Sequence, residues 1–80
     1  MMGGSQIAKK IVAEALHVQP DMIDESVSSD TSELWDSVAH INIMLAVEEC
    51  IGGGIPVEQI FQLNSVPSIA VFLDQNIQHK

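Results

Sequence analysis

Asp36 and Ser37 form an acid–hydroxyl pair where a polar stretch gives way to a long apolar segment. A serine hydroxyl can act as a nucleophile or carry a phosphate-linked group, and an acid just before a helix can cap it. His40 follows Ser37 by three positions, a spacing at which two side chains can meet on a helix surface. The residue types therefore allow either a modified serine or a hydrolytic serine–histidine pair.

The hydrolytic interpretation is the weaker one. Catalysis by serine also needs an oriented base, an oxyanion hole and a substrate pocket. Asp36 adjoins Ser37 in sequence and is poorly placed to hold the far nitrogen of His40, and a small bundle offers little room for a preformed pocket. We therefore predict that the protein is not an enzyme and that His40 is a partly buried packing residue near Trp35.

The segment after Ser37 predicts a helix with two apolar sides. At roughly 100° per residue, one broad arc is apolar and should face the core. This core arc consists of Ala39, Ile43, Met44, Ala46, Val47, Cys50 and Ile51. The opposite side carries a short apolar ridge of Val38, Ile41 and Leu45, framed by Asn42, Glu48 and Glu49. A surface helix usually covers its outer side with polar residues alone, so the ridge indicates a contact surface.

The run Asp-Ser-Val-Ala-His-Ile-Asn-Ile-Met-Leu-Ala-Val-Glu-Glu resembles the modification site of acyl carrier proteins. In that family an Asp-Ser-Leu motif begins the second helix, and the serine carries 4′-phosphopantetheine. Ser37 matches the modified serine and Asp36 the acid before it, whereas Val38 stands where leucine is usual. The resemblance continues through a glycine-containing loop, Ile55-Pro56 and a last helix that opens at Ser65-Val66, so it covers most of the chain.

The resemblance implies a free-standing acyl carrier protein of fatty acid or polyketide biosynthesis. A phosphopantetheinyl transferase would attach the arm from coenzyme A to Ser37, and the terminal thiol would hold an acyl group as a thioester for acyl-loading and acyl-processing enzymes. Two alternatives remain open: an aminoacyl or peptidyl carrier of a thiotemplate pathway, and an unmodified acidic helical adaptor. His40 and Asn42 stand where acids are common in the family, which favours a specialised pathway.

Physical chemistry supports Ser37 as the modified residue independently of the resemblance. The first backbone N–H groups of a helix lack intrahelical partners, and with the helix dipole they favour negative charge. A phosphodiester on Ser37 would lie in that field. We expect Asp36 to cap the helix, and it could also help to hold a divalent cation during transfer of the arm.

The outer side of the same helix is the expected docking surface for basic partner enzymes. Glu48, Glu49, Asp36 and Glu58 would supply charge, and the apolar ridge would supply contact area. Trp35 directly precedes the site and has two interpretations: it closes the preceding loop over the core, or it contacts partners near the arm. The sequence does not decide between them.

Composition limits the partners further. The net charge is −8 with no arginine, and lysine occurs only at positions 9, 10 and 80, so the surface repels nucleic acid and anionic membrane. The histidines and Cys50 show no spacing of a zinc site. A single cysteine cannot form an internal disulfide, and neither a signal peptide nor a membrane span is evident. We expect a cytoplasmic monomer.

Hydrophobic periodicity predicts an all-α fold, a small four-helix bundle with three longer helices and one short third helix. Residues 1–80 should form a single acyl-carrier-like domain in which residues 1–4 are frayed. The expected helices run from about Gln6 to His17 with Ser5 as the cap, from Ser37 to Cys50, from Val57 to Leu63, and onward from Val66, with Ser65 as the cap and Ile77 on the buried stripe.

A long, polar and acidic loop should connect the first two helices over residues 18–36. We expect four apolar side chains to pin it to the core: Met22, Ile23, Val27 and Leu34. Three consecutive glycines, residues 52–54, should end the second helix firmly, because glycine accepts the left-handed conformation that ends helices. Ile60 and Phe61 are expected to pack inward, and Cys50 is expected to be buried.

Overall fold

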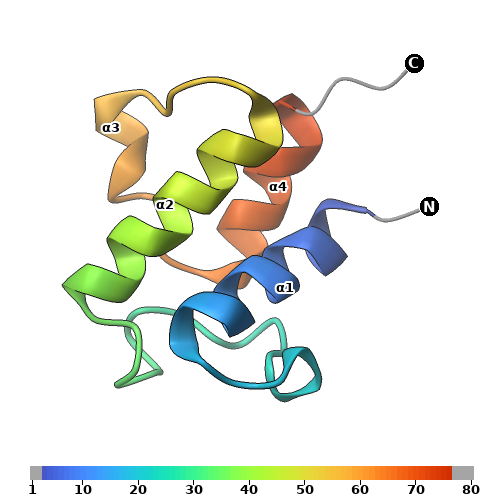
Figure 1. Cartoon of the computed structure of the whole chain (residues 1–80), viewed down its shortest axis with the longest axis vertical. Helices are drawn as coiled ribbons and strands as arrows, with labels where there is room; N and C mark the ends of the chain where they lie inside the picture. The colour runs from blue at the N-terminus through green and yellow to red at the C-terminus, as the bar shows by residue number, and fades with distance from the viewer. Residues whose placement is uncertain (1–2, 77–80) are drawn as a thin grey trace.

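The computed structural model describes residues 3–76, and this part of the chain is an all-α bundle, as the sequence predicts (Figure 1). The elements are α1 (Gly4–Leu16), the 3-10 turn η1 (Pro20–Met22), α2 (Ser37–Ile51), α3 (Val57–Ile60) and α4 (Val66–Asn76). α2 ends at Ile51, one residue later than predicted. α3 ends at Ile60, three residues before its predicted end at Leu63. Among the described residues, no helix is long and apolar enough to cross a membrane.

The core lies between the three longer helices. α1 packs against both α4 and α2, whereas α3 lies at the margin beside α2 (Figure 1). The largest fully buried side chains come from these three helices: Val12, Ile43, Val47, Val66, Ile69 and Leu73. α3 contributes no buried residue. Ile77, predicted to extend the stripe of α4, lies outside the described residues.

The first turn of α1 is held tightly against α4. The Gly4 N–H donates a hydrogen bond to Oδ1 of Asp74 at 2.9 Å, and a Cβ on Gly4 would lie 2.5 Å from the carbonyl oxygen of Ala70. Glycine is therefore needed for this close approach. The prediction that residues 1–4 are frayed was wrong for Gly4, although residues 1 and 2 lie outside the described chain. Ser5 was wrongly predicted as the cap, since α1 begins before it and has no side-chain cap.

Two backbone hydrogen bonds fasten the long loop to the connection between α3 and α4. The Ser29 N–H donates to the carbonyl of Asn64 at 2.8 Å, and the Val66 N–H donates to the carbonyl of Val27 at 3.1 Å. Ile23 is buried and Val27 is half-buried, as predicted. These contacts hold the residues that precede Ser37 against the bundle.

The other two predicted anchors of this loop were wrong. Met22 and Leu34 are 68% and 56% exposed. Hydrogen bonds inside the loop supply part of its order instead: the backbone N–H and the hydroxyl of Ser26 both donate to Oδ1 of Asp24. These bonds favour the ionised carboxylate and lower the pKa of Asp24.

Cys50 and Phe61 also differ from the prediction. Cys50 is exposed, because the core arc of α2 is wider than the surface that α1 and α4 cover; Ala46 and Ile51 at its margins are only half-buried. Phe61 follows the end of α3 and is 77% exposed, while Leu63 takes the core position. Ile60 is half-buried, in partial agreement with the prediction.

Candidate functional site

Ser37 is the first residue of α2, and its side chain is exposed. Asp36 occupies the N-cap position with extended backbone, and its Oδ1 accepts a hydrogen bond from the Ala39 N–H at 2.9 Å. The predicted cap is therefore confirmed. One N–H of the first turn is satisfied by this carboxylate, and the hydroxyl of Ser37 stands free at the positive end of a 15-residue helix.

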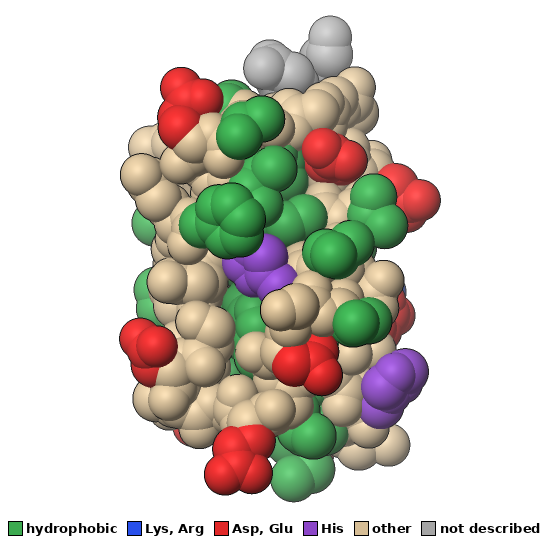
Figure 2. Space-filling view, turned by 90° about the vertical axis from the view of Figure 1, so that its left-hand side faces the viewer, with side chains coloured by type: hydrophobic (Ala, Val, Ile, Leu, Met, Phe, Trp, Pro, Cys, Tyr) green, Lys and Arg blue, Asp and Glu red, His purple; other side chains and the backbone are tan. Residues whose placement is uncertain are grey.

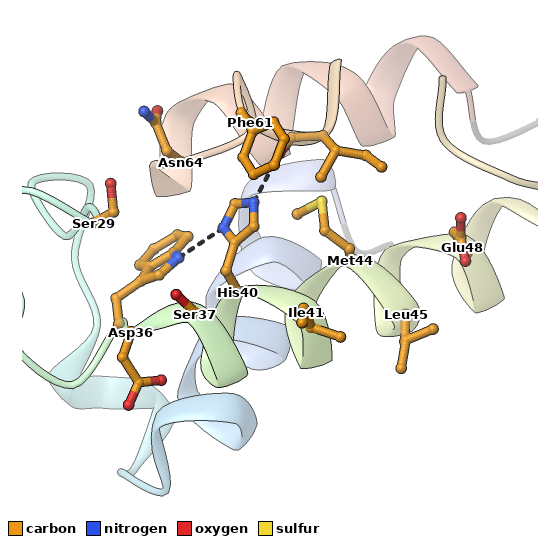
Figure 3. A pocket seen from close by; sticks show the side chains of 12 residues that line it. Ser29, Asp36, Ser37, His40, Ile41, Met44, Leu45, Glu48, Phe61 and Asn64 are labelled. Carbon is orange, nitrogen blue, oxygen red and sulfur yellow. Dashed lines mark hydrogen bonds between the residues drawn. The ribbon is translucent and has the colours of Figure 1, made fainter. Parts of the chain in front are cut away.

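An open groove of about 680 Å³ lies between α2 and the α3 segment, which we call the α2–α3 groove (Figure 3). Its lining consists of Ser29, Trp35, Asp36, Ser37, His40, Ile41, Met44, Leu45, Glu48, Ile60, Phe61 and Asn64. On this face of the molecule, apolar side chains gather around a histidine, with carboxylates toward the margins (Figure 2). The prediction that a small bundle leaves little room for a pocket was wrong.

His40 lies inside this groove and links its two walls. The indole Nε1–H of Trp35 donates to His40 Nδ1 at 3.0 Å, and His40 Nε2 bonds to the carbonyl oxygen of Ile60 at 2.8 Å (Figure 3). His40 is half-buried and adjacent to Trp35, as predicted. Both ring nitrogens are engaged elsewhere, so neither is free to act as a base for Ser37.

The sequence leaves open whether Trp35 closes the long loop over the core or contacts partners, and its burial bears on this choice. The side chain is only 5% exposed and belongs to the hydrophobic core. Its packing closes the long loop over the bundle next to Ser37. Little of its surface is available for contact with another protein.

The apolar ridge of α2 points outward. Val38, Ile41 and Leu45 are 66%, 59% and 56% exposed, and the last two also line the α2–α3 groove. The ridge and the groove therefore form one continuous apolar surface that begins beside Ser37.

The two glutamates of the predicted docking surface have different surroundings. Glu48 is half-buried, and its Oε2 accepts a hydrogen bond from the Ile55 N–H at 3.0 Å. Glu49 is exposed and lines a second, smaller hollow between α1 and α2, together with Lys10 and Cys50. Only Glu48 borders the α2–α3 groove.

The far wall of the groove was missed at the sequence level. Ile60, Phe61 and Asn64 come from a part of the chain remote from the Asp-Ser pair, and Ser29 comes from the preceding loop. No local pattern joins residue 40 to residue 60, and the sequence gives no signal of a surface role for Phe61, which it predicts to pack inward. In the described residues, no group of three or more His, Cys, Asp or Glu side chains could hold a metal ion.

Comparison with known proteins gives one clear relationship. No protein-family model matches the chain. The chain is 32% identical over 68 residues to a protein named "Acyl carrier protein" from Zymomonas mobilis subsp. mobilis (strain ATCC 31821 / ZM4 / CP4). The alignment covers 85% of this chain and 87% of that relative, so the similarity extends well beyond the segment around Ser37.

Proposed function

Because this chain belongs to the acyl carrier protein family, we propose that Ser37 carries 4′-phosphopantetheine and that the protein presents acyl groups to partner enzymes. The observation that carries the proposal is the exposed hydroxyl of Ser37 at the capped start of α2. The end of the attached arm would supply a thiol for thioester chemistry. The protein's own residues would supply attachment, electrostatic support and a docking surface.

The residues around Ser37 fit a phosphate-linked group. The hydroxyl is accessible to a transferase, and the start of a long helix favours the negative charge of a phosphodiester. Asp36 occupies the cap with Oδ1 bonded to the Ala39 N–H, which keeps the first turn of α2 in place. No lysine or arginine lines the groove, so the helix terminus is the feature there that favours an anion.

The α2–α3 groove fits the apolar part of such a cargo. It begins at Ser37 and is lined along its length by Ile41, Met44 and Leu45 on one side and Ile60 and Phe61 on the other. Burial of apolar surface against these side chains would be favourable, at about 25 cal/mol per Å². An uncharged acyl chain suits this lining better than a charged one.

The apolar ridge and its acidic frame suit transient docking. Val38, Ile41 and Leu45 would form the contact centre, while Asp36, Glu48 and Glu49 with the net charge of −8 would attract basic enzymes. Such surfaces combine fast encounter with modest contact area, which allows a carrier to leave one enzyme and reach the next.

The decisive experiment is intact mass after incubation with a broad-specificity phosphopantetheinyl transferase and coenzyme A. The unaltered protein should gain one arm, and Ser37→Ala should gain none while keeping its far-ultraviolet circular dichroism. Ser5→Ala is the matched control and should be modified normally. Absence of modification in the unaltered protein would refute the carrier proposal, and modification of Ser37→Ala would refute the assigned residue. Loading tests with acyl and amino acids would then identify the cargo.

A further inference from the structure

His40 joins three separate parts of the fold by its two ring nitrogens. It is on α2, it accepts from the indole of Trp35 in the long loop, and it bonds to the carbonyl of Ile60 at the end of α3. Its ring also lies parallel to that of Phe61, with centroids 6.2 Å apart and an interplanar angle of 2°. One side chain on α2 is thus bonded to both the long loop and α3.

The partners fix the protonation state of the imidazole. An indole N–H can only donate, so Nδ1 of His40 must present a lone pair. A backbone carbonyl can only accept, so Nε2 must carry the proton. Both bonds exist together only in the neutral tautomer that is protonated at Nε2.

α3 is anchored mainly at its flanks, where Ile55 and Leu63 are buried, and not by buried residues of the helix itself. The helix is a single turn of four residues, none of them buried, and it has no side-chain cap at its N-terminus. Ile60 is half-buried and Phe61 is exposed, so the first buried residue after the helix is Leu63. The bond from His40 to the last carbonyl of α3 therefore adds a direct link from α2 to a helix that is otherwise anchored at its flanks.

We propose that His40 is a proton-sensitive latch that holds α3 and the Trp35 loop together across the groove. When Nδ1 takes a proton from solvent, its new N–H faces the N–H of Trp35, and two donors cannot share that bond. Either the indole or the imidazole must then turn away; when the imidazole turns, its Nε2 leaves the Ile60 carbonyl, and the groove wall at Ile60 and Phe61 shifts with it. The inference goes beyond the carrier function and does not depend on modification of Ser37.

Other ionisable side chains border the latch. Asp36, the N-cap at the end of the long loop, and Glu48 on α2 line the same groove, while the α3 segment presents Glu58 at its exposed surface. Apart from Asp36, the long loop contributes only the uncharged Ser29 and Trp35 to the lining of the groove, and no ionisable residue of α4 takes part. The test must therefore separate the titration of His40 from that of these carboxylates.

The test uses ¹⁵N-labelled, unmodified full chain and nuclear magnetic resonance. In a titration from about pH 8 to about pH 5, a ¹⁵N–¹⁵N coupling across the hydrogen bond between Trp35 Nε1 and His40 Nδ1 should be present while the His40 ring nitrogens report the neutral imidazole, and it should be lost as they report the imidazolium. The chain has a single tryptophan, so the indole signal is unambiguous. The backbone amides of Phe61 and Gln62 should shift with the same midpoint as the His40 ring nitrogens, and that of Val12 in α1 should not.

Two variants complete the test. His40→Gln keeps a donor for the Ile60 carbonyl and all three carboxylates but cannot titrate in this range, so the Phe61 response should disappear. Trp35→Phe keeps His40 titratable but removes the opposing donor, so the Phe61 response should fall several-fold. A missing coupling at about pH 8, a Phe61 amide that does not follow His40, or a full response in either variant would overturn the latch.

Discussion

The Glu48 carboxylate of α2 accepts a hydrogen bond from the backbone N–H of Ile55, with Oε2 and N 3.0 Å apart. Ile55 is buried and directly follows the three glycines, residues 52–54, that end α2. Gly52 has φ 73°, a left-handed conformation that glycine adopts without strain. The bond therefore fastens the far end of a loop whose composition gives it little stiffness of its own.

Removal of this carboxylate should loosen the loop. In Glu48→Ala the backbone N–H of Ile55 loses its carboxylate partner, so its hydrogen exchange should be faster and the free energy of unfolding should fall by about 1–3 kcal/mol. Glu49→Ala is the matched control, because Glu49 is exposed and next in sequence. The measurement is hydrogen exchange of the Ile55 amide, monitored by nuclear magnetic resonance. Equal protection of this amide in Glu48→Ala and Glu49→Ala would contradict a fastening role for Glu48.

The charged and the apolar parts of the predicted docking surface can be tested separately. Glu49→Lys should slow phosphopantetheinylation most at low ionic strength, with the deficit shrinking as salt screens the field. Leu45→Ala should weaken binding with little change in salt dependence, since apolar contacts mainly set the lifetime of a complex. The measurement is the initial modification rate against salt concentration for each variant, with circular dichroism as the folding control.

Reversal of charge at Glu48 would be a poor probe of docking. The sequence places Glu48 and Glu49 together in one acidic frame, but only Glu48 is tied to the Ile55 backbone. A lysine at position 48 would change loop structure and surface charge at once. An effect of Glu49→Lys that does not diminish at high salt would argue against electrostatic steering, and unfolding of Leu45→Ala would show that the apolar ridge belongs to the core.

The packing of α4 provides a test of the core. Leu73 is fully buried, whereas Val71 on the same helix is 54% exposed. Leu73→Ala should lower the free energy of unfolding by about 2–5 kcal/mol, because it removes buried methyl groups and leaves a cavity. Val71→Ala should change it by less than about 0.5 kcal/mol, as most exposed substitutions do. Similar denaturant midpoints for the two variants would show that α4 is not docked as described.

The local elements were predictable because their signals are local. The Asp-Ser pair at an abrupt change from polar to apolar residues locates the start of α2, and the glycine run locates its end. The apolar residues of α4 recur three and four positions apart, and this pattern can be read from the sequence of the helix alone. Ser65 was also correctly predicted as a cap, since its hydroxyl accepts a hydrogen bond from the Ser68 N–H at 3.2 Å.

The errors arose where distant parts of the chain decide the outcome. Cys50 lies on the apolar arc of α2 but is exposed, because none of the other helices within residues 3–76 covers it. Gly4 is buried only because α4 brings Ala70 and Asp74 against it, 66 and 70 positions later. The groove likewise depends on Ile60 meeting His40, which a helical wheel of either segment cannot show.

Asp36 has two separable roles that substitution can distinguish. As the N-cap of α2 it accepts from the Ala39 N–H, and as a carboxylate beside Ser37 it could bind a cation during transfer of the arm. Asp36→Asn keeps an oxygen for the cap but removes the charge, whereas Asp36→Ala removes both. The alanine variant should therefore lose about 0.5–2 kcal/mol of stability, and the asparagine variant should remain close to the unaltered protein.

Modification rates of the two variants then separate the roles, with chemical denaturation as the measure of stability. If Asp36 acts through the carboxylate, both variants should be modified slowly by the transferase, although only Asp36→Ala is destabilised. If Asp36 acts through the cap alone, Asp36→Asn should be modified at the normal rate. We expect the first result, because Asp36 is exposed directly beside the hydroxyl that the transferase must reach. A normal rate for Asp36→Asn would restrict Asp36 to helix capping.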